Sequence, residues 1–266
     1  MQSFKPSTPS FDNKLLIFDI ETIPDVEQAP SICPLLVKGN SNKELKSALT
    51  ECFATTFLPN FLHRIVAIGI LLVSPSSSRG FEIEQLHTNV NVDEKALLSW
   101  FLKDLVAESK PIFVTYNGRN FDVPVVNLRA MKHDISAACL YENFSKWEGY
   151  LAANSEWHKD LMHWYSGPSR RNIGLDNIAS FLQLPTKLEG VSGKEVEDLF
   201  YDCEYDTISR YCERDVIITY LLFLYEQYTR GKITLLQRKE SIKNLLQHTE
   251  DQELGEELEV LLEKQP

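Results

Sequence analysis

Short apolar runs separated by polar turns predict a sheet whose first three strands follow one another along the chain. Residues 14–20 form the first predicted strand, and residues 64–73 (RIVAIGILLV) form a second that is apolar on both faces and therefore central. Residues 81–86 are a third candidate, after the turn signal SPSSSRG. Residues 111–116 return to strand character, and residues 158–163 are a candidate short strand.

Apolar residues spaced three and four apart predict helices between and after these strands. The predicted helices cover residues 93–108, 121–133, 174–184 and 206–228, and a last one runs from residue 233 through an acidic tail. The segment between the first two strands holds four prolines and a helical stretch near residues 42–53, and insertions of this length are more often functional than idle. The element order predicts an α/β fold, a mixed central sheet with helices on both faces.

The chain length and composition favour one large soluble domain. We expect this domain over residues 10–230, with residues 231–266 as a helical acidic extension. With 43% hydrophobic and 24% charged residues, the composition is ordinary, and no apolar stretch approaches the length needed to cross a bilayer. Residues 1–9 are polar and lack the features of a signal peptide, so a cytoplasmic location without membrane association is expected.

The cysteines predict neither a disulfide framework nor a zinc site. They are odd in number, and no two of them form a Cys-x-x-Cys pair. We expect them to be small core or surface residues. The five are Cys33, Cys52, Cys139, Cys203 and Cys212.

The net charge of −11 is unfavourable for binding nucleic acid, because phosphate binding normally needs a basic surface. The charge is uneven: residues 250–264 hold seven acidic residues and one basic residue, so this tail carries −6 and the remainder −5. Metal ions would neutralise part of that remainder. The acidity therefore weakens a nucleic-acid function without excluding it, and the tail is a candidate surface for a protein partner or for self-association.

Two carboxylates lie on one face of the first predicted strand. Asp19 and Glu21 are two residues apart, and side chains at that spacing share a strand face. Asp-x-Glu occurs four times in the chain, but only this copy lies on a credible buried strand. Because a buried carboxylate is costly unless it is compensated, a divalent cation is the simplest explanation for the pair.

Further carboxylates fall at two other predicted positions. Asp122 follows a strand and the Asn117-Gly118 turn at the start of a helix, where it could equally complement the helix dipole. Tyr211 and Asp215 are four residues apart on the apolar face of a long helix, and an ion pair is the alternative explanation for Asp215. If the four carboxylates converge, an all-oxygen site selects Mg²⁺ or Mn²⁺ over zinc.

On these motifs the chain resembles the DEDD exonuclease superfamily, tyrosine-type branch, and within it the 3′-5′ exonuclease domain of family B DNA polymerases. The first motif matches Asp19-Ile20-Glu21, the second runs from Asn117 to Phe121-Asp122, and the third, Tyr-x-x-x-Asp, matches Tyr211 to Asp215. The resemblance spans residues 15 to about 220 and implies a ribonuclease H-like fold, with the first three strands antiparallel and the later ones parallel.

The resemblance also implies a reaction. Phosphodiester bonds at nucleic acid 3′ ends would be hydrolysed with two Mg²⁺ or Mn²⁺ ions, one activating a water and the other stabilising the leaving 3′ oxygen, to release nucleoside 5′-monophosphates. Asp19 would bridge the ions, Glu21 and Asp215 would complete the nucleophile-side ion, and Asp122 would hold the second. Tyr211 would orient the attacking water.

For the substrate, the resemblance points to Thr22, Asn117 and Phe121 as contacts of the terminal nucleotide, although core packing explains Phe121 equally well. Single-stranded or frayed 3′ ends of DNA are the expected substrates, and RNA is the alternative substrate. The six histidines show no ligand pattern and are interpreted as structural.

Two other functions compete with this hypothesis. The chain could be an inactive relative that uses the fold to bind nucleic acid or as a scaffold. It could also be a phosphatase that forms an aspartyl-phosphate at Asp19, but that chemistry would not require Tyr211 spaced from Asp215.

Overall fold

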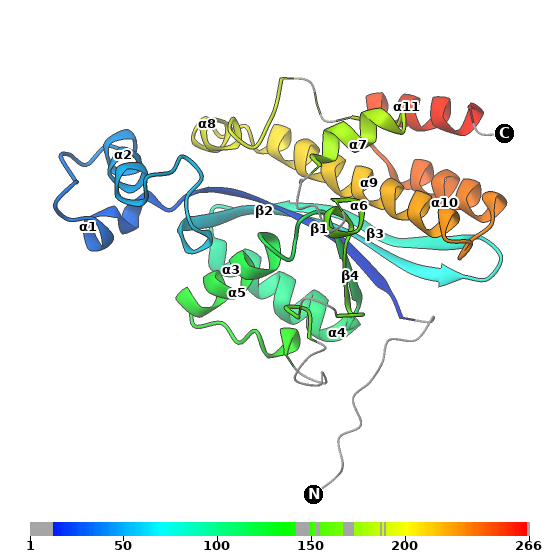
Figure 1. The fold of residues 1–266 in the computed structure, drawn as a ribbon, viewed down its shortest axis with the longest axis horizontal. Helices are drawn as coiled ribbons and strands as arrows, with labels where there is room; N and C mark the ends of the chain where they lie inside the picture. The colour runs from blue at the N-terminus through cyan, green and yellow to red at the C-terminus, as the bar shows by residue number, and fades with distance from the viewer. Residues whose placement is uncertain are drawn as a thin grey trace, which may run out of the picture.

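A mixed sheet forms the centre of the computed structural model, which describes residues 13–141, 149–152, 155–166, 173–186, 188 and 190–264. Among these residues the strands are β1 (Leu15–Pro24), β2 (His63–Ser76), β3 (Gly80–Val90), β4 (Ile112–Thr115) and β5 (His158–Asp160). Their order in the sheet is β3-β2-β1-β4-β5 (Figure 1). The pairs β3/β2 and β2/β1 are antiparallel, whereas β1/β4 and β4/β5 are parallel. The predicted mixed sheet is confirmed.

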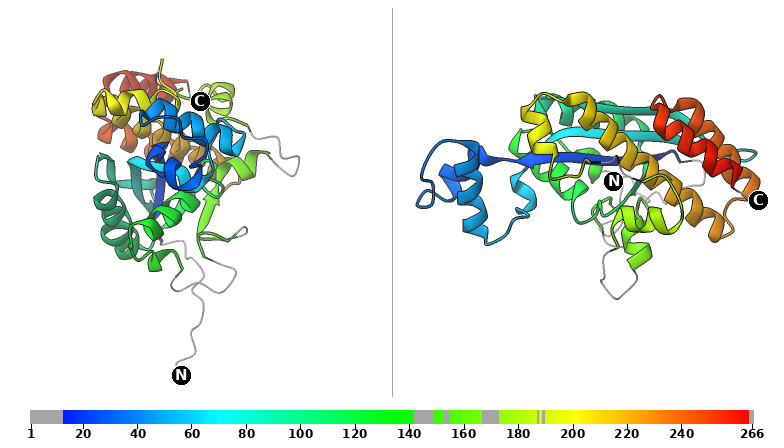
Figure 2. Two further views of the ribbon diagram at one scale, coloured as in Figure 1. Left: turned by 90° about the vertical axis from the view of Figure 1, so that its left-hand side faces the viewer. Right: turned by 90° about the horizontal axis from the view of Figure 1, so that it is seen from above.

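Helices cover both faces of this sheet (Figures 1 and 2). One face carries α3 (Glu94–Ser99), η3 (Trp100–Val106), α4 (Ala107–Ser109) and α5 (Asp122–Lys132). The other carries α9 (Tyr205–Thr229), which crosses β1, β2 and β3, and α10 (Leu235–His248), which packs on β3. Shorter helices lie beside α9, namely α6 (Leu161–Ser166), α7 (Leu175–Phe181) and α8 (Val196–Tyr201).

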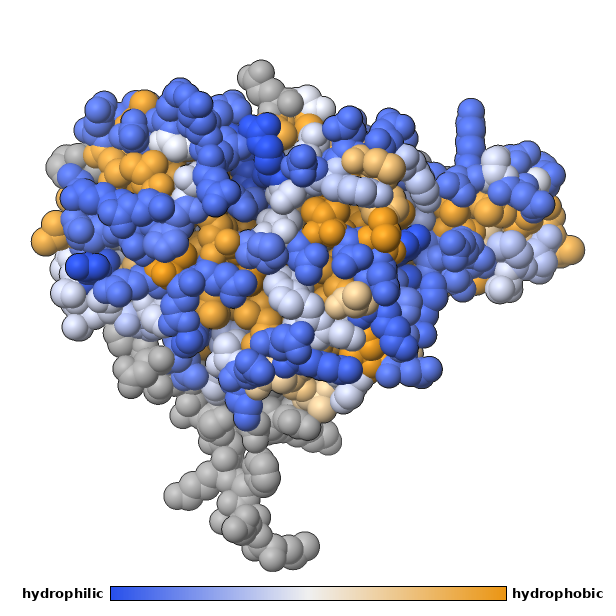
Figure 3. All heavy atoms as spheres, turned by 180° about the vertical axis from the view of Figure 1, so that it is seen from behind, coloured by the Kyte–Doolittle hydropathy of each residue, from blue (hydrophilic) through white to orange (hydrophobic). Residues whose placement is uncertain are grey.

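The predicted insertion forms a lobe at one end of the sheet (Figure 2). It contains η1 (Val26–Gln28), α1 (Ala29–Ile32), α2 (Asn42–Phe53) and η2 (Asn60–Leu62). A capping box starts α2: the Ser41 side chain accepts from the Glu44 backbone N–H, while Glu44 accepts from the Ser41 backbone. The lobe has a small apolar core of its own, and Figure 3 shows hydrophobic residues at its surface.

The expectation that no cysteine forms a disulfide is wrong for one pair. Cys33 follows α1 and Cys52 lies near the end of α2, and the two are bonded with their Cα atoms 6.3 Å apart. The lobe core folds α2 back over α1, which brings together residues separated by 19 positions. Spacing in the sequence cannot reveal such a contact. Cys139, Cys203 and Cys212 are not disulfide-bonded.

Two predicted elements differ from the structure. The candidate strand over residues 158–163 ends at Asp160, and α6 begins at the next residue. The single final helix is two helices, because Thr249 adopts an extended backbone after α10 and Asp251 caps α11 (Gln252–Glu263) by accepting from the Leu254 N–H. The break lets α11 fold back on α10.

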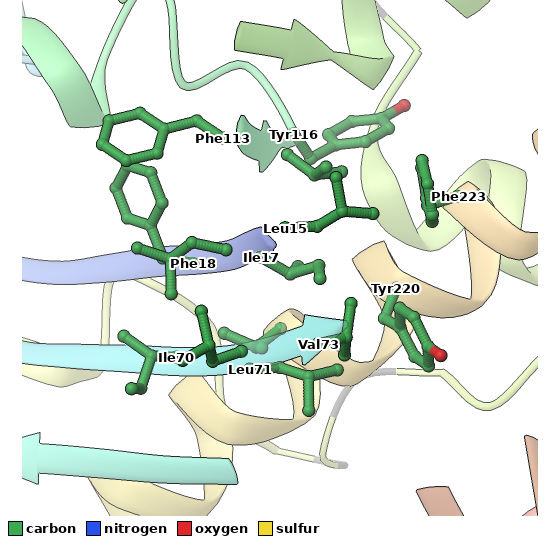
Figure 4. Packing of buried hydrophobic residues seen from close by; sticks show 14 of the residues in the cluster. Leu15, Ile17, Phe18, Ile70, Leu71, Val73, Phe113, Tyr116, Tyr220 and Phe223 are labelled. Carbon is green, nitrogen blue, oxygen red and sulfur yellow. The ribbon is translucent and has the colours of Figure 1, made fainter. Parts of the chain in front are cut away.

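The main core lies between β1, β2 and the helices on both faces of the sheet. Figure 4 shows Phe18 and Phe113 packed together, with their ring centroids 4.9 Å apart. On the opposite side of the strands, Tyr220 and Phe223 of α9 face Ile17 and its neighbours. Both faces of β1 are therefore apolar over its first residues, Leu15–Phe18, as their apolar run predicts. Among the described helices, none is long and apolar enough to span a bilayer.

Candidate active site

The candidate site lies where β1 extends beyond its parallel neighbour β4. β4 pairs with β1 only over Leu15–Ile17, while β1 continues to Pro24. Beyond that pairing, the backbone N–H of Ile20 donates to Oδ1 of Asp122 at 3.2 Å. The first residue of α5 thus supplies the acceptor that a neighbouring strand would otherwise provide. This hydrogen bond joins the first two sequence motifs.

Asp19 and Glu21 share the face of β1 that α9 covers. Ligand atoms of these two residues and of Cys212 in α9 all lie within 4.8 Å of one another. The close approach depends on Gly69, the β2 partner of Asp19, because a Cβ there would lie 2.9 Å from the Cys212 Sγ. A bare backbone at this position lets α9 reach the carboxylates.

Asp215 and Tyr211 approach the same region from α9. Both are buried, with 5% of Asp215 and 2% of Tyr211 exposed. Burial, together with the charges of Asp160 and Asp215, raises the pKa of Asp122 to about 7. Asp215 therefore lies within electrostatic range of Asp122.

The same electrostatic argument links Asp215 to the β1 pair. Burial raises the pKa of the Cys212 thiol, and Asp19, Glu21 and Asp215 add to the effect. The structure thus brings Asp19 and Glu21 together beside Cys212, and Asp215 lies close enough to act electrostatically on both Cys212 and Asp122. Of the four predicted carboxylates, Asp19 is half-buried and the other three are buried.

These residues fit a hard divalent cation. Four carboxylates supply the oxygen donors that Mg²⁺ and Mn²⁺ prefer, and a cation would offset the like charges that raise the pKa of Asp122. The sulfur of Cys212 suits such ions less well, because a thiol must lose its proton to bind metal and the neighbouring carboxylates oppose that loss.

Asp160 is a residue of this region that the sequence interpretation missed. At the end of β5, its carboxylate accepts from the backbone N–H groups of Asn117 and Arg119, both at 3.0 Å. These bonds hold the turn that leads to Asp122, in which Asn117 adopts a left-handed φ of 70°. A lone aspartate ending a three-residue strand gives no local signal of this role.

Two of the three predicted nucleotide contacts meet through a residue from the insertion. Thr22 Oγ1 lies 2.9 Å from Nδ1 of His63, and the His63 ring stands edge-on to Phe121 with centroids 4.9 Å apart. Phe57 packs on both rings and is 63% exposed. Asn117 instead accepts a hydrogen bond from the side chain of Asn120. Neither His63 nor Phe57 stood out in the sequence.

The chain matches one protein family over most of its length. The profile of the family described as predicted 3′-5′ exonucleases related to the exonuclease domain of PolB matches residues 55–264. These residues include Asp122, Tyr211 and Asp215, whereas Asp19 and Glu21 precede them. No curated protein matches the chain.

Among solved structures, the chain is similar to the family B DNA polymerase from the hyperthermophilic archaeon Pyrobaculum calidifontis. The TM-score is 0.52 and the sequence identity is 16%, so this likeness concerns the fold. It covers 90% of this chain and 29% of the polymerase chain. Because the family profile extends over most of the sequence and the fold agrees, the chain belongs to the family of predicted 3′-5′ exonucleases related to the exonuclease domain of PolB.

Proposed function

We propose that the protein is a metal-dependent 3′-5′ exonuclease that hydrolyses phosphodiester bonds at nucleic acid 3′ ends and releases nucleoside 5′-monophosphates. The observation that carries this proposal is the Asp19–Glu21 pair of β1, whose ligand atoms lie within 4.8 Å of one another and of Cys212, with Asp215 in electrostatic range of Cys212 and of Asp122. Membership of a family of predicted exonucleases supports the same activity.

The four carboxylates would hold two Mg²⁺ or Mn²⁺ ions. Asp19 would contact both ions, Glu21 and Asp215 would complete one, and Asp122 would hold the other. When bound, such ions activate a water and stabilise a leaving oxygen. The Ile20 N–H bond to Asp122 keeps one oxygen of that carboxylate in place, so its position does not depend on the cation.

Other side chains would position the reactants. Tyr211 lies one helical turn before Asp215 on the same face of α9, and we assign its hydroxyl to orienting the attacking water. Thr22, Asn117 and Phe121 would hold the terminal nucleotide, single-stranded or frayed, on the side of β1 where the His63 and Phe121 rings lie. Phe57 is an exposed ring in contact with Phe121, on which a base could stack.

A labelled-oligonucleotide assay tests this function. DNA and RNA strands labelled at the 5′ end, with Mg²⁺ or Mn²⁺, should give a ladder that shortens from the 3′ end. Asp19→Ala should lower the rate about 10³-fold, as expected when several kcal/mol of transition-state stabilisation are lost. The matched control is Asp202→Ala, in an exposed Asp-x-Glu pair. If no oligonucleotide is shortened with either metal, the proposal is wrong.

A further inference from the structure

The hydrogen bonds of His63 determine which of its nitrogens carries the proton. Nε2 lies 3.0 Å from the backbone oxygen of Leu58, which can only accept a hydrogen bond. Nε2 must therefore be protonated. Burial lowers the pKa of His63, and with 8% of the residue exposed the ring is neutral near pH 7. In a neutral imidazole the other nitrogen, Nδ1, is an acceptor.

The state of His63 determines what Thr22 can bind. Because Nδ1 of His63 accepts, the Thr22 hydroxyl 2.9 Å away must donate its only proton to it. Thr22 Oγ1 then has only lone pairs left for a ligand. Phosphate oxygens are acceptors and would find no donor there, whereas a hydroxyl group would find an acceptor.

Thr22 is next to Glu21 in β1, and its hydroxyl lies on the side of the strand where the His63 and Phe121 rings lie. Thr22 is half-buried and lies at a register shift in the β1/β2 pairing. The terminal sugar of a DNA strand carries a free 3′-hydroxyl whatever its base.

We propose that His63 is a positioning residue that turns Thr22 into an acceptor for the 3′-hydroxyl of the terminal nucleotide. This inference rests on the proposed exonuclease function. It assigns a specificity role to the insertion, because His63 is the residue at which the insertion rejoins the sheet. Contacts with Phe57 and Phe121 hold the imidazole in the orientation that the two hydrogen bonds require.

The test compares two DNA oligonucleotides that differ only in the 3′-terminal hydroxyl, one ending in a normal nucleotide and the other in a 3′-deoxynucleotide. For the wild-type protein, removal of the hydroxyl should lower kcat/KM about three- to tenfold, the range for one neutral hydrogen bond. Thr22→Val should bring this ratio close to one, and Thr22→Ser should keep it. His63→Phe retains the ring and should lower the ratio, because the Thr22 hydroxyl is then no longer held as an acceptor.

A variant that combines Thr22→Val with His63→Phe distinguishes a positioning role of His63 from a general loss of folding or activity. If His63 acts through Thr22, adding His63→Phe to Thr22→Val should leave the hydroxyl ratio unchanged, since the two residues form one unit. His87→Phe, at an exposed histidine of β3, is the matched control and should keep the wild-type ratio. Thermal unfolding of each variant shows whether it folds.

The possible results distinguish this inference from the proposed function. Failure to cleave either oligonucleotide with any metal overturns the function. Cleavage of both at equal rates by the wild-type protein, or a ratio that changes with the terminal base and not with the hydroxyl, overturns the role of Thr22. If His63→Phe keeps the wild-type ratio of kcat/KM between the two oligonucleotides, the role of His63 is overturned. Equilibrium binding of the two oligonucleotides with Ca²⁺ measures the hydroxyl preference without turnover, and equal affinities also contradict it.

Discussion

Buried carboxylates of this protein have opposite pKa shifts, depending on their neighbours. Burial raises the pKa of Asp25, but hydrogen bonds and charge from Lys132 and Arg129 outweigh it and hold the pKa below its ordinary value. For Asp122, burial is reinforced by the charges of Asp160 and Asp215, and its pKa rises to about 7. Asp25 is thus stabilised as an anion by protein cations, whereas Asp122 lies where a metal ion would be most effective.

The buried residue His158 should make the folding stability of the protein depend on pH. His158 is fully buried, with Nε2 accepting from the Thr115 hydroxyl and Nδ1 donating to the backbone oxygen of Tyr150. Burial lowers the pKa of His158 to about 4, from the ordinary value of 6.5 for an exposed histidine. Between these values the unfolded chain binds a proton that the folded protein does not, so stability is full above pH 6.5 and falls as the pH drops toward 4.

The expected loss from His158 across this window is about 3 kcal/mol. Urea unfolding between pH 4 and 7 measures it. His158→Asn can keep the hydrogen bond to the Tyr150 oxygen without titrating and should flatten the profile, whereas His248→Asn, at an exposed position, should not. A wild-type profile as flat as that of His158→Asn would contradict the prediction.

Among the elements, the insertion contributes most to the surroundings of the site. The insertion ends at His63, the first residue of β2. Just before it, the side chain of Asn60 donates a hydrogen bond to the backbone oxygen of Asn120 in the second motif. Arg129 of α5 binds Asp25, at the start of the insertion, with 2.5 Å between the charged atoms. Both ends of the lobe therefore contact α5 or the turn that leads into it.

The exposed ring of Phe57 gives a prediction for this element. Phe57→Ala should weaken binding of single-stranded oligonucleotides at least about fivefold, because stacking on an aromatic ring contributes about 1–3 kcal/mol per base. Fluorescence anisotropy with Ca²⁺ in place of a catalytic metal measures the affinity. Phe181→Ala, at a ring of α7 that is 82% exposed, is the control and should bind normally. Equal affinities for the two variants would exclude stacking on Phe57.

The disulfide of the lobe is open to direct chemical measurement. Protein purified without reductant and unfolded in denaturant should show three reactive thiols, and five after reduction. Cys33→Ser should show four without reductant. Five thiols before reduction would mean that Cys33 and Cys52 are not bonded. The bond closes a loop between residues 19 apart, so reduction should lower the unfolding free energy by about 3 kcal/mol.

At the scale of the whole molecule, the acidic tail is bound to the helix that carries Tyr211 and Asp215. Three leucines of α11 are buried, and Glu257 pairs with Arg214 at 2.5 Å. Arg210 pairs with Asp251 in the same way at 2.7 Å. Part of the tail charge thus serves internal contacts. Its role toward a protein partner or in self-association stays a prediction.

Deletion of residues 250–266 should destabilise the molecule. It would expose the surface beneath Leu254, Leu258 and Leu261, each worth about 1.5–3 kcal/mol, and would leave Arg214, with 3% of its side chain exposed, without Glu257. We expect a lower melting temperature and a lower nuclease rate. Glu256→Gln and Glu259→Gln should have no effect on either. A truncated protein with wild-type melting temperature but altered oligomeric state would favour a docking role for the tail.

The sequence by itself determined the elements and the candidate carboxylates. Apolar periodicity is a local property, so β1, β2, α5 and α9 lie close to their predicted positions. The motif spacing in β1 and α9 likewise places Asp19 with Glu21, and Tyr211 with Asp215, on common faces. The family assignment agrees with the resemblance that these motifs carry.

Only the tertiary structure decided which distant residues meet. Several contacts join segments far apart in the chain: the hydrogen bond between Thr22 and His63, the support of the second motif by Asp160, and the Cys33–Cys52 disulfide. The early end of the β1/β4 pairing was likewise decided by the packing of the whole chain. The tertiary structure also decided the break between α10 and α11, because the leucines of α11 become buried only when this helix folds back on the molecule. Local patterns record which face of an element is apolar, whereas the partner of that face depends on the packing of the whole chain.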